Sequence, residues 1–128
     1  MANIVTTTVL GDGASNVLQV VTGVLDTSDY PSTSITNRLA LVPVPPMLRL
    51  DMIFFSIEDG LTCMLWWEAN VDALILPLAG RGKFDFDWFA GWTNPKPAGY
   101  TGDIKLSTSG WSGLKHFTLM LEYTKQGV

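Results

Sequence analysis

The stretch KFDFDWF, residues 83–89, shows the clearest alternation of apolar and charged side chains in this chain. Phe84, Phe86 and Trp88 recur at every second position, and an aspartate stands between neighbouring rings. Successive side chains of a β-strand point to opposite faces, so a period of two places the three rings on one face. The pattern therefore predicts a half-buried strand whose acidic face is solvated.

The same alternation recurs near the end of the chain and in several other segments. In residues 115–124, one face carries Phe117, Leu119, Leu121 and Tyr123. Further extended segments bounded by glycine, proline and aspartate turns are expected at residues 4–10, 17–24, 35–42, 48–57, 61–69, 73–78 and 103–107. Turns spaced roughly every 8 to 12 residues are typical of β-sandwiches and small barrels.

We therefore predict an all-β fold: a single-domain β-sandwich or jelly-roll-like barrel of about eight strands. The domain would span residues 1–128 and begin with an extended N-terminal segment. Residues 91–102 contain three glycines and two prolines and are expected to form a long ordered loop. Residues 61–75 also contain spacings that a helix could use. Their length and turn placement favour strands, and the helical alternative stays open at this point.

Two of the expected strands are apolar on both faces. In residues 48–57, one face would carry Leu48, Leu50, Met52 and Phe54, and the other Ile53, Phe55 and Ile57. In residues 61–69, one face would carry Leu61, Cys63, Leu65 and Trp67, and the other Met64 and Trp66. A strand that is apolar on both faces should be covered on both. In a sandwich of two layers, the second cover is a loop or a neighbouring subunit.

The composition also indicates a covered apolar surface. Of the 128 residues, 47% are hydrophobic and 16% are charged, whereas charged residues usually make up about 25% of a globular protein. This composition excludes disordered and collagen-like classes. A chain of this size cannot hide so much apolar surface alone, so we expect other protein subunits to cover part of it.

The sequence also argues against a membrane or a nucleic acid as the partner. The densest apolar run, residues 61–78, is interrupted by Glu68, Asn70 and Asp72, so no stretch matches the about 20 apolar residues of a membrane-spanning helix. No secretory leader is expected at the start of the chain. The net charge is −4 and the eight lysines and arginines are scattered, so nucleic acid is not an expected partner. Cys63 is the only cysteine, so the chain cannot form an internal disulfide. This is what we expect of a protein that is made and assembled in a reducing cytoplasm.

No residue pattern indicates catalysis or metal binding. His116, the only histidine, falls on the polar face of the last expected strand without a nucleophile motif. Asp85 and Asp87 share one side of a strand, but the clean alternation favours a solvated face over acid–base chemistry. One cysteine and one histidine cannot make a structural zinc site. We predict that the protein is not an enzyme and has no catalytic residues, cofactor or metal.

Tryptophans supply the strongest candidates for binding. Trp92 and Trp111 fall in expected loops, where exposed rings could form a sugar-binding platform. Aromatic side chains are also enriched at protein interfaces, and the shortage of charged residues favours an interface over a sugar site. The candidate interface residues are Ile4, Val5, Val42, Pro45, Phe55, Trp66, Trp92 and Trp111.

Three blocks of sequence carry a resemblance to a known class of protein. They are LVPVPPMLRLDMIFFSIEDGLTCMLWWEAN (residues 41–70), LPLAGRGKFDFDWFAGW (76–92) and TGDIKLSTSGWSGLKHFTLMLEYTKQ (101–126). From about residue 39 onward, the chain resembles small virion structural proteins of tailed bacteriophages. The most specific piece is the ending, in which Thr101-Gly102-Asp103-Ile104 precedes a short strand, a turn and the last strand. The turn departs from the usual pattern because Trp111 makes it bulkier.

The resemblance implies a capsid decoration, or cement, protein. Such a protein is a β-sandwich on the outer surface of the capsid, often a homotrimer, that stabilises contacts between subunits of the major capsid protein. It would be made in the host cytoplasm and located on the virion. Two alternatives stay open: a tail or adaptor component of the same virion, and a carbohydrate-binding β-sandwich module that uses Trp92 or Trp111.

Overall fold

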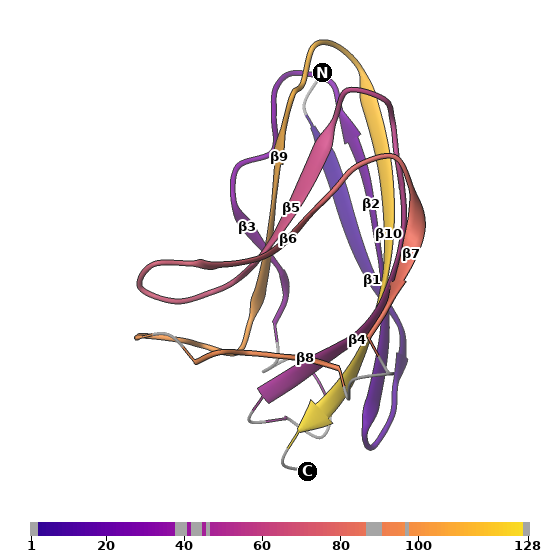
Figure 1. Ribbon diagram of the computed structural model, residues 1–128. Helices are drawn as coiled ribbons and strands as arrows, with labels where there is room; N and C mark the ends of the chain where they lie inside the picture. Colours follow the sequence, from indigo (N-terminus) through magenta and orange to yellow (C-terminus); the bar gives the residue numbers. More distant parts are fainter. Residues whose placement is uncertain are drawn as a thin grey trace.

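The computed structural model describes residues 3–37, 41, 45, 47–86, 91–96 and 98–126, and this part of the chain forms ten β-strands (Figure 1). The strands are β1 (Ile4–Asp12), β2 (Asn16–Leu25), β3 (Thr33–Thr36), β4 (Met47–Ile57), β5 (Thr62–Trp67), β6 (Ala73–Leu78), β7 (Arg81–Asp85), β8 (Trp92–Thr93), β9 (Ile104–Ser109) and β10 (Lys115–Gln126). The larger, six-stranded sheet has the order β1-β2-β10-β4-β7, and β8 also pairs with β4. The four-stranded sheet has the order β3-β9-β5-β6. The predicted all-β class and β-sandwich are confirmed.

Two details of the architecture differ from the prediction. The count of about eight strands was too low, because the segment expected as a loop after residue 91 contains β8. The barrel alternative is also wrong, because in the described part of the chain each sheet has two unpaired edges and does not close. The third predicted strand, residues 35–42, corresponds to β3, which covers Thr33–Thr36. Its residues 38–40 and 42 lie outside the described part of the chain.

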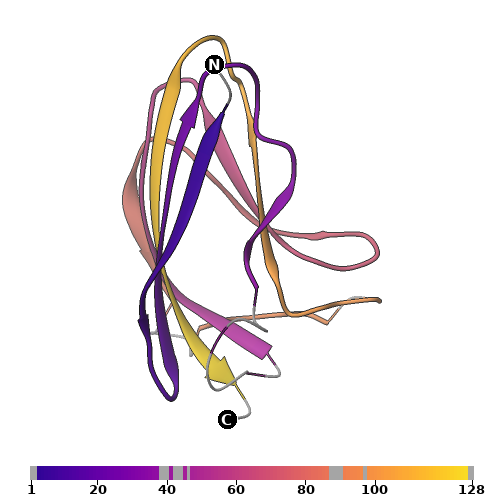
Figure 2. The ribbon, with the colours of Figure 1, turned by 180° about the vertical axis from the view of Figure 1, so that it is seen from behind.

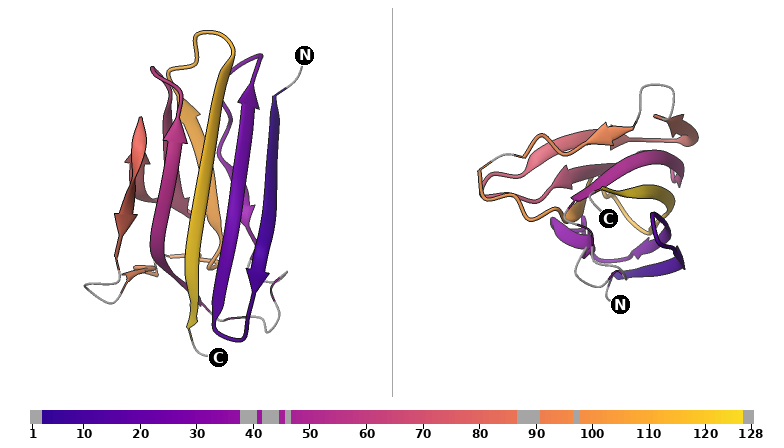
Figure 3. Two further views of the ribbon diagram at one scale, coloured as in Figure 1. Left: turned by 90° about the vertical axis from the view of Figure 1, so that its right-hand side faces the viewer. Right: turned by 90° about the horizontal axis from the view of Figure 1, so that it is seen from below.

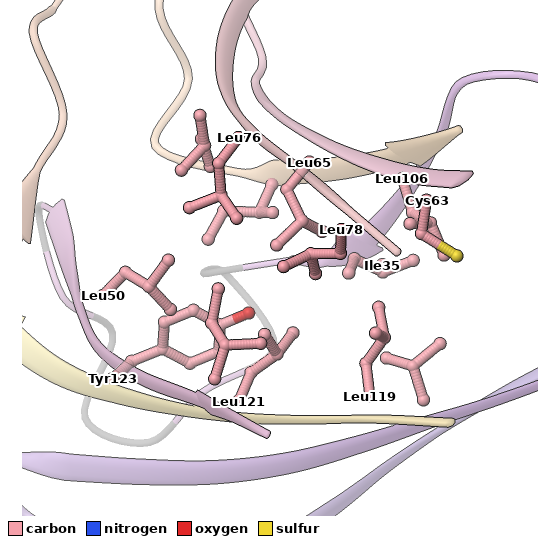
Figure 4. Close-up of a cluster of buried hydrophobic side chains, with 14 of the residues drawn as sticks. Ile35, Leu50, Cys63, Leu65, Leu76, Leu78, Leu106, Leu119, Leu121 and Tyr123 are labelled. Atoms are coloured by element: carbon pink, nitrogen blue, oxygen red, sulfur yellow. The ribbon is translucent and has the colours of Figure 1, made fainter. Parts of the chain in front are cut away.

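The core lies between the two sheets and is formed by the alternating residues that the sequence singled out. In β10, Phe117, Leu119, Leu121 and Tyr123 are at most 2% exposed, as predicted. Leu119, Leu121 and Tyr123 face apolar side chains of the smaller sheet, such as Leu65 and Leu78, across the sandwich (Figure 4). The prediction for β5 is likewise confirmed, since Cys63, Leu65 and Trp67 are buried while Met64 and Trp66 are half-buried. Strands rather than a helix therefore form there.

A small polar network connects the sheets inside this apolar core. The Thr36 hydroxyl in β3 donates to Gln19 Oε1 in β2 at 2.6 Å and lies 2.9 Å from the Tyr123 hydroxyl in β10. Gln19 Nε2 in turn donates to the carbonyl oxygen of Ile35. Burial raises the pKa of Tyr123, and the hydrogen bond between Tyr123 and Thr36 opposes this in part. Because each buried polar atom of the network has a partner, the network holds β3 against the larger sheet at little cost in desolvation.

A β-bulge explains why the fourth strand looked apolar on both faces. Glu122 of β10 pairs with Met52, but the next residue, Tyr123, pairs with Leu50, so Asp51 is an extra residue in β4. A bulge of this kind exchanges the faces of the residues that follow it. Leu50 and Ile53 therefore both point into the core.

The predicted faces of residues 48–57 were wrong for this reason. Met52 and Phe54 do not share a face with Leu48 and Leu50, because the extra residue Asp51 shifts the alternation of inward and outward side chains by one position. The bulge is held in place by the Asp51 carboxylate, which is 4% exposed as a residue and accepts a hydrogen bond from Arg49 Nε at 2.8 Å. The hydroxyl of Thr124 donates to the other carboxylate oxygen.

Gly23 in β2 lies opposite Phe117 of β10, and the Phe117 ring occupies the space above the glycine. A Cβ atom at position 23 would lie 2.2 Å from a carbon of this ring, which is buried. We expect Gly23→Ala to lower the free energy of unfolding by about 1–3 kcal/mol through overpacking. Urea denaturation measures the loss, and the smaller Phe117→Leu side chain should recover part of it in the double variant. Strictly additive losses would contradict this contact.

Candidate interaction surfaces

The predicted interface residues do not gather on one surface. Ile4 lies on β1 and is 59% exposed, whereas Val5 points inward and packs against the core. Trp66 lies on the outer face of the smaller sheet, on the opposite side of the sandwich from the outer face of the larger sheet. Pro45 is buried, and Val42 lies outside the described residues.

Phe55 and Trp92 belong to a series of packed rings at the β7 side of the larger sheet. The ring centroids of Phe55 and Phe84 are 5.7 Å apart, and those of Phe84 and Phe86 are 6.1 Å apart, both stacked. Trp92 meets Phe86 edge to face at 5.3 Å. Phe86 is buried, but Phe84 remains 44% exposed.

For residues 83–86, the described part of the segment 83–89, the predicted alternation is confirmed, but the predicted burial is confirmed only in part. Phe84 pairs with the inward-facing Ile53, whereas Asp85 pairs with Met52, which points outward. β7 itself is exposed at every residue because it is an edge strand. Asp87, Trp88 and Phe89 lie outside the described part of the chain.

Trp92 and Trp111 were the candidates for a sugar platform, and both rings are half-buried against the core. The indole Nε1 of Trp111 donates to the carbonyl oxygen of Leu25 at 2.9 Å, and its backbone N donates to Asp29 Oδ1 at 3.0 Å. Trp66 Nε1 likewise donates to Ser107 Oγ at 2.9 Å. These contacts occupy the polar atoms of the Trp66 and Trp111 rings, which leaves those atoms unable to donate to a sugar.

The outer face of the larger sheet, seen with its strands side by side in Figure 3, carries two rows of aligned residues. Cross-strand pairing aligns the first, which we call the apolar row: Val20, Met120 and Phe54. It aligns the second, which we call the hydroxyl row: Thr6, Thr22, Thr118 and Ser56. All four hydroxyl-row residues are exposed, and Phe54 is 41% exposed. None of the residues in the two rows is charged. On the neighbouring edge strand β7, Arg81 pairs with Ser56, and Lys83 Nζ lies 5.3 Å from the centre of the Phe54 ring.

Two loops project together from one side of the sandwich, as the opposite views of Figures 1 and 2 show. They connect β5 to β6 and β8 to β9, and backbone hydrogen bonds join them, among these Asn70 N to Ala98 O at 3.1 Å. Lys105 Nζ lies 3.3 Å from Asp72 Oδ2 and so ties the first loop to β9. Val71 near the end of this pair is 82% exposed, which makes it the most exposed of the large apolar side chains in the described residues.

The geometry around His116 does not form a nucleophile–base pair. A shallow hollow of about 220 Å³ is lined by His116, Glu58, Arg81, Ser56 and Thr118 among others. His116 Nδ1 lies 3.5 Å from Glu58 Oε1, and its side chain is 56% exposed. No hydrogen bond joins the imidazole to either hydroxyl, although such a contact is what activates a serine or threonine nucleophile.

Cys63 lies in the core, and burial raises the pKa of its thiol to about 12. The neutral thiol is a poor nucleophile and a poor metal ligand. Within the described ranges, no group of three or more histidine, cysteine, aspartate or glutamate side chains could hold a metal ion. The same residues include no helix long and apolar enough to cross a membrane.

Comparisons with protein families, with curated proteins and with solved structures gave no match to this chain. The arrangement of the surface is therefore the basis for assigning a function. Sequence patterns missed the apolar and hydroxyl rows, since each row combines residues from three or four strands that are distant in the chain.

Proposed function

We propose that this protein is a non-enzymatic structural protein of a tailed-phage virion. It would act as a decoration, or cement, protein on the outer capsid surface, where it stabilises contacts between major capsid subunits. The observation that carries this proposal is the outer face of the six-stranded sheet. The apolar row and the hydroxyl row form two adjacent uncharged rows across β2, β10 and β4, bordered on this face by Glu122 of β10, in a chain with 16% charged residues.

A cement protein needs contact area rather than reactive groups, and this requirement fits the described surface. Apolar area removed from water contributes about 25 cal/mol per Å² before the costs of association. Phe54, Met120 and Val20 supply apolar area on one face, and the exposed hydroxyl groups beside them supply hydrogen-bond donors and acceptors. Many copies bound to one lattice add to this through avidity, so each single contact can be modest.

Binding to empty heads of the phage that encodes the chain tests the proposal. The purified protein is mixed with heads that lack it, and bound protein is separated by sedimentation. We expect saturable binding, with a copy number that matches the repeated positions of the shell lattice. A copy number of only a few per particle, with binding confined to one vertex or to tails, would identify a tail or adaptor component instead. Absence of binding to either structure would overturn the virion proposal.

A pair of matched variants tests whether the outer face of the larger sheet makes the contact. Phe54→Asp places a charge in the apolar row, and we expect it to weaken head binding by at least about tenfold, equivalent to about 1.4 kcal/mol. Leu74→Asp makes the same kind of change on the opposite outer face, at a side chain that is 50% exposed against 41% for Phe54. Leu74→Asp should bind like the unaltered protein. Equal losses in both variants would contradict the assigned face.

A further inference from the structure

We propose that two copies of this protein associate by antiparallel pairing of their β1 strands, which joins two six-stranded sheets into one continuous sheet. β1 lies at one edge of the larger sheet, beside β2, as the left view of Figure 3 shows. An edge strand presents unpaired backbone N–H and C=O groups, and proteins normally protect such edges against pairing with another chain. Self-association can be measured on the isolated protein, independently of any capsid.

Three of the four sheet edges carry a protective feature. β7, at the far edge of the larger sheet, exposes Arg81, Lys83 and Asp85, and charged side chains discourage pairing. β6, at one edge of the smaller sheet, contains Pro77, which has no N–H to donate. β3, at the other edge, has only four residues.

β1 has none of these features over most of its length. It is nine residues long, and its sequence IVTTTVLGD contains no proline and no charge before Asp12. Its pairing with β2 is regular from Ile4 to Val9 and shifts only between Val9 and Gly11. Within the residues that the structure describes, β2 is the one strand that pairs with it. Ile4 is 59% exposed and Leu10 is 57% exposed, so apolar side chains flank the open backbone.

A second copy of the chain is the partner that this edge fits best. An antiparallel pair of identical strands satisfies a two-fold axis, so each strand supplies the groups that the other needs. A register centred on Thr7 would set Val5 against Val9 and Thr6 against Thr8 across the two copies, and such pairs stabilise antiparallel sheets. The uncharged segment from Ile4 to Leu10 brings no like charges together, although the chain as a whole has a net charge of −4.

The distribution of protective features also limits the size of the assembly. A head-to-tail contact would pair β1 with the charged edge strand β7, whereas a β1–β1 contact uses the unprotected edge of both copies. Each copy has one such edge among its described strands, so the pairing closes at a dimer and does not extend into a filament. This differs from the trimer that the resemblance implies for a cement protein.

Sedimentation velocity of the full chain over a concentration series tests the proposal. We expect the mass of two chains at high concentration. The variant Thr6→Lys with Thr8→Lys should raise the dissociation constant at least about tenfold, because like charges placed opposite each other destabilise a strand pair. The control, Thr22→Lys with Thr118→Lys, adds the same charge to exposed threonines of the same face on interior strands. The control should stay dimeric, and circular dichroism checks that both variants are folded.

Amide hydrogen exchange of the unaltered protein gives a second measurement that needs no variant. Raising the concentration should slow exchange at alternate amides of residues 4–9 and leave the edge amides of β7 unchanged. A mass of one chain at every concentration, or a mass of three chains, would overturn the proposal. Equal dissociation of the edge variant and its control would also overturn it, because that result would place the contact on the sheet face.

Discussion

Asp12→Ala is expected to lower the free energy of unfolding by about 3 kcal/mol, because it leaves a buried ammonium group without its carboxylate. The side chain of Lys125 near the end of β10 is fully buried, and Nζ donates to Asp12 Oδ1 and to the carbonyl oxygen of Gly13 at 2.8 Å. Both acceptors belong to the end of the β1–β2 hairpin. The pair therefore fastens the C-terminal end of β10 to this hairpin, and urea denaturation followed by tryptophan fluorescence measures its loss.

The double variant Asp12→Ala with Lys125→Met separates the cost of a buried unpaired charge from the value of the pair itself. Methionine keeps much of the length of lysine and removes the charge, so nothing charged is left buried. We expect the double variant to be more stable than Asp12→Ala alone. If the two have the same stability, the ammonium group of Lys125 reaches water in Asp12→Ala and the electrostatic explanation fails.

Phe86→Asp is expected to destabilise the protein by more than about 4 kcal/mol and to abolish cooperative unfolding at room temperature, because it places an unpaired carboxylate in the core. Phe86 is 5% exposed and contacts Trp92 edge to face. Its backbone N donates to the carbonyl oxygen of the bulge residue Asp51 at 2.8 Å. Circular dichroism and thermal denaturation measure the effect.

The neighbouring position supplies the matched control. Asp85→Ser changes a side chain that is 46% exposed and lies 3.9 Å from Lys83, a surface ion pair that contributes little. Its effect should stay within about 0.5 kcal/mol. Phe86→Leu separates charge from size, since it keeps an apolar side chain and should remain folded. Similar losses for Phe86→Asp and Asp85→Ser would show that the assigned faces of this segment are incorrect.

Local alternation was sufficient to predict most of the core. In β5 and β10 the period of two runs without interruption, so the inward residues from Cys63 to Trp67 and from Phe117 to Tyr123 could be read directly. In β4 the same method failed at Asp51. The bulge exists because Tyr123 pairs with Leu50 rather than with Asp51, and this register depends on a strand some 70 residues away.

The candidate interaction surface was less predictable than the core. The sequence predicted tryptophans as binding residues. In the structure, however, the indole N–H groups of Trp66 and Trp111 donate hydrogen bonds to neighbouring polar atoms of the protein. The rows on the outer face are formed by threonine, serine, valine, methionine and phenylalanine side chains that are unremarkable within their own strands. Their alignment follows from strand order, which places β10 between β2 and β4.

The amino-acid sequence by itself determined that this protein is all-β, where most of its strands lie, and which side of most strands is apolar. These properties are local, since they depend on the spacing of side chains along one strand and on the turn residues beside it. Only the tertiary structure decided which strands end the sheets, where the register shifts, and which side chains share a surface. Such properties arise from hydrogen bonds between strands that are distant in the chain. Nothing in the local sequence of β1, for example, indicates that β1 lies at the edge of a sheet.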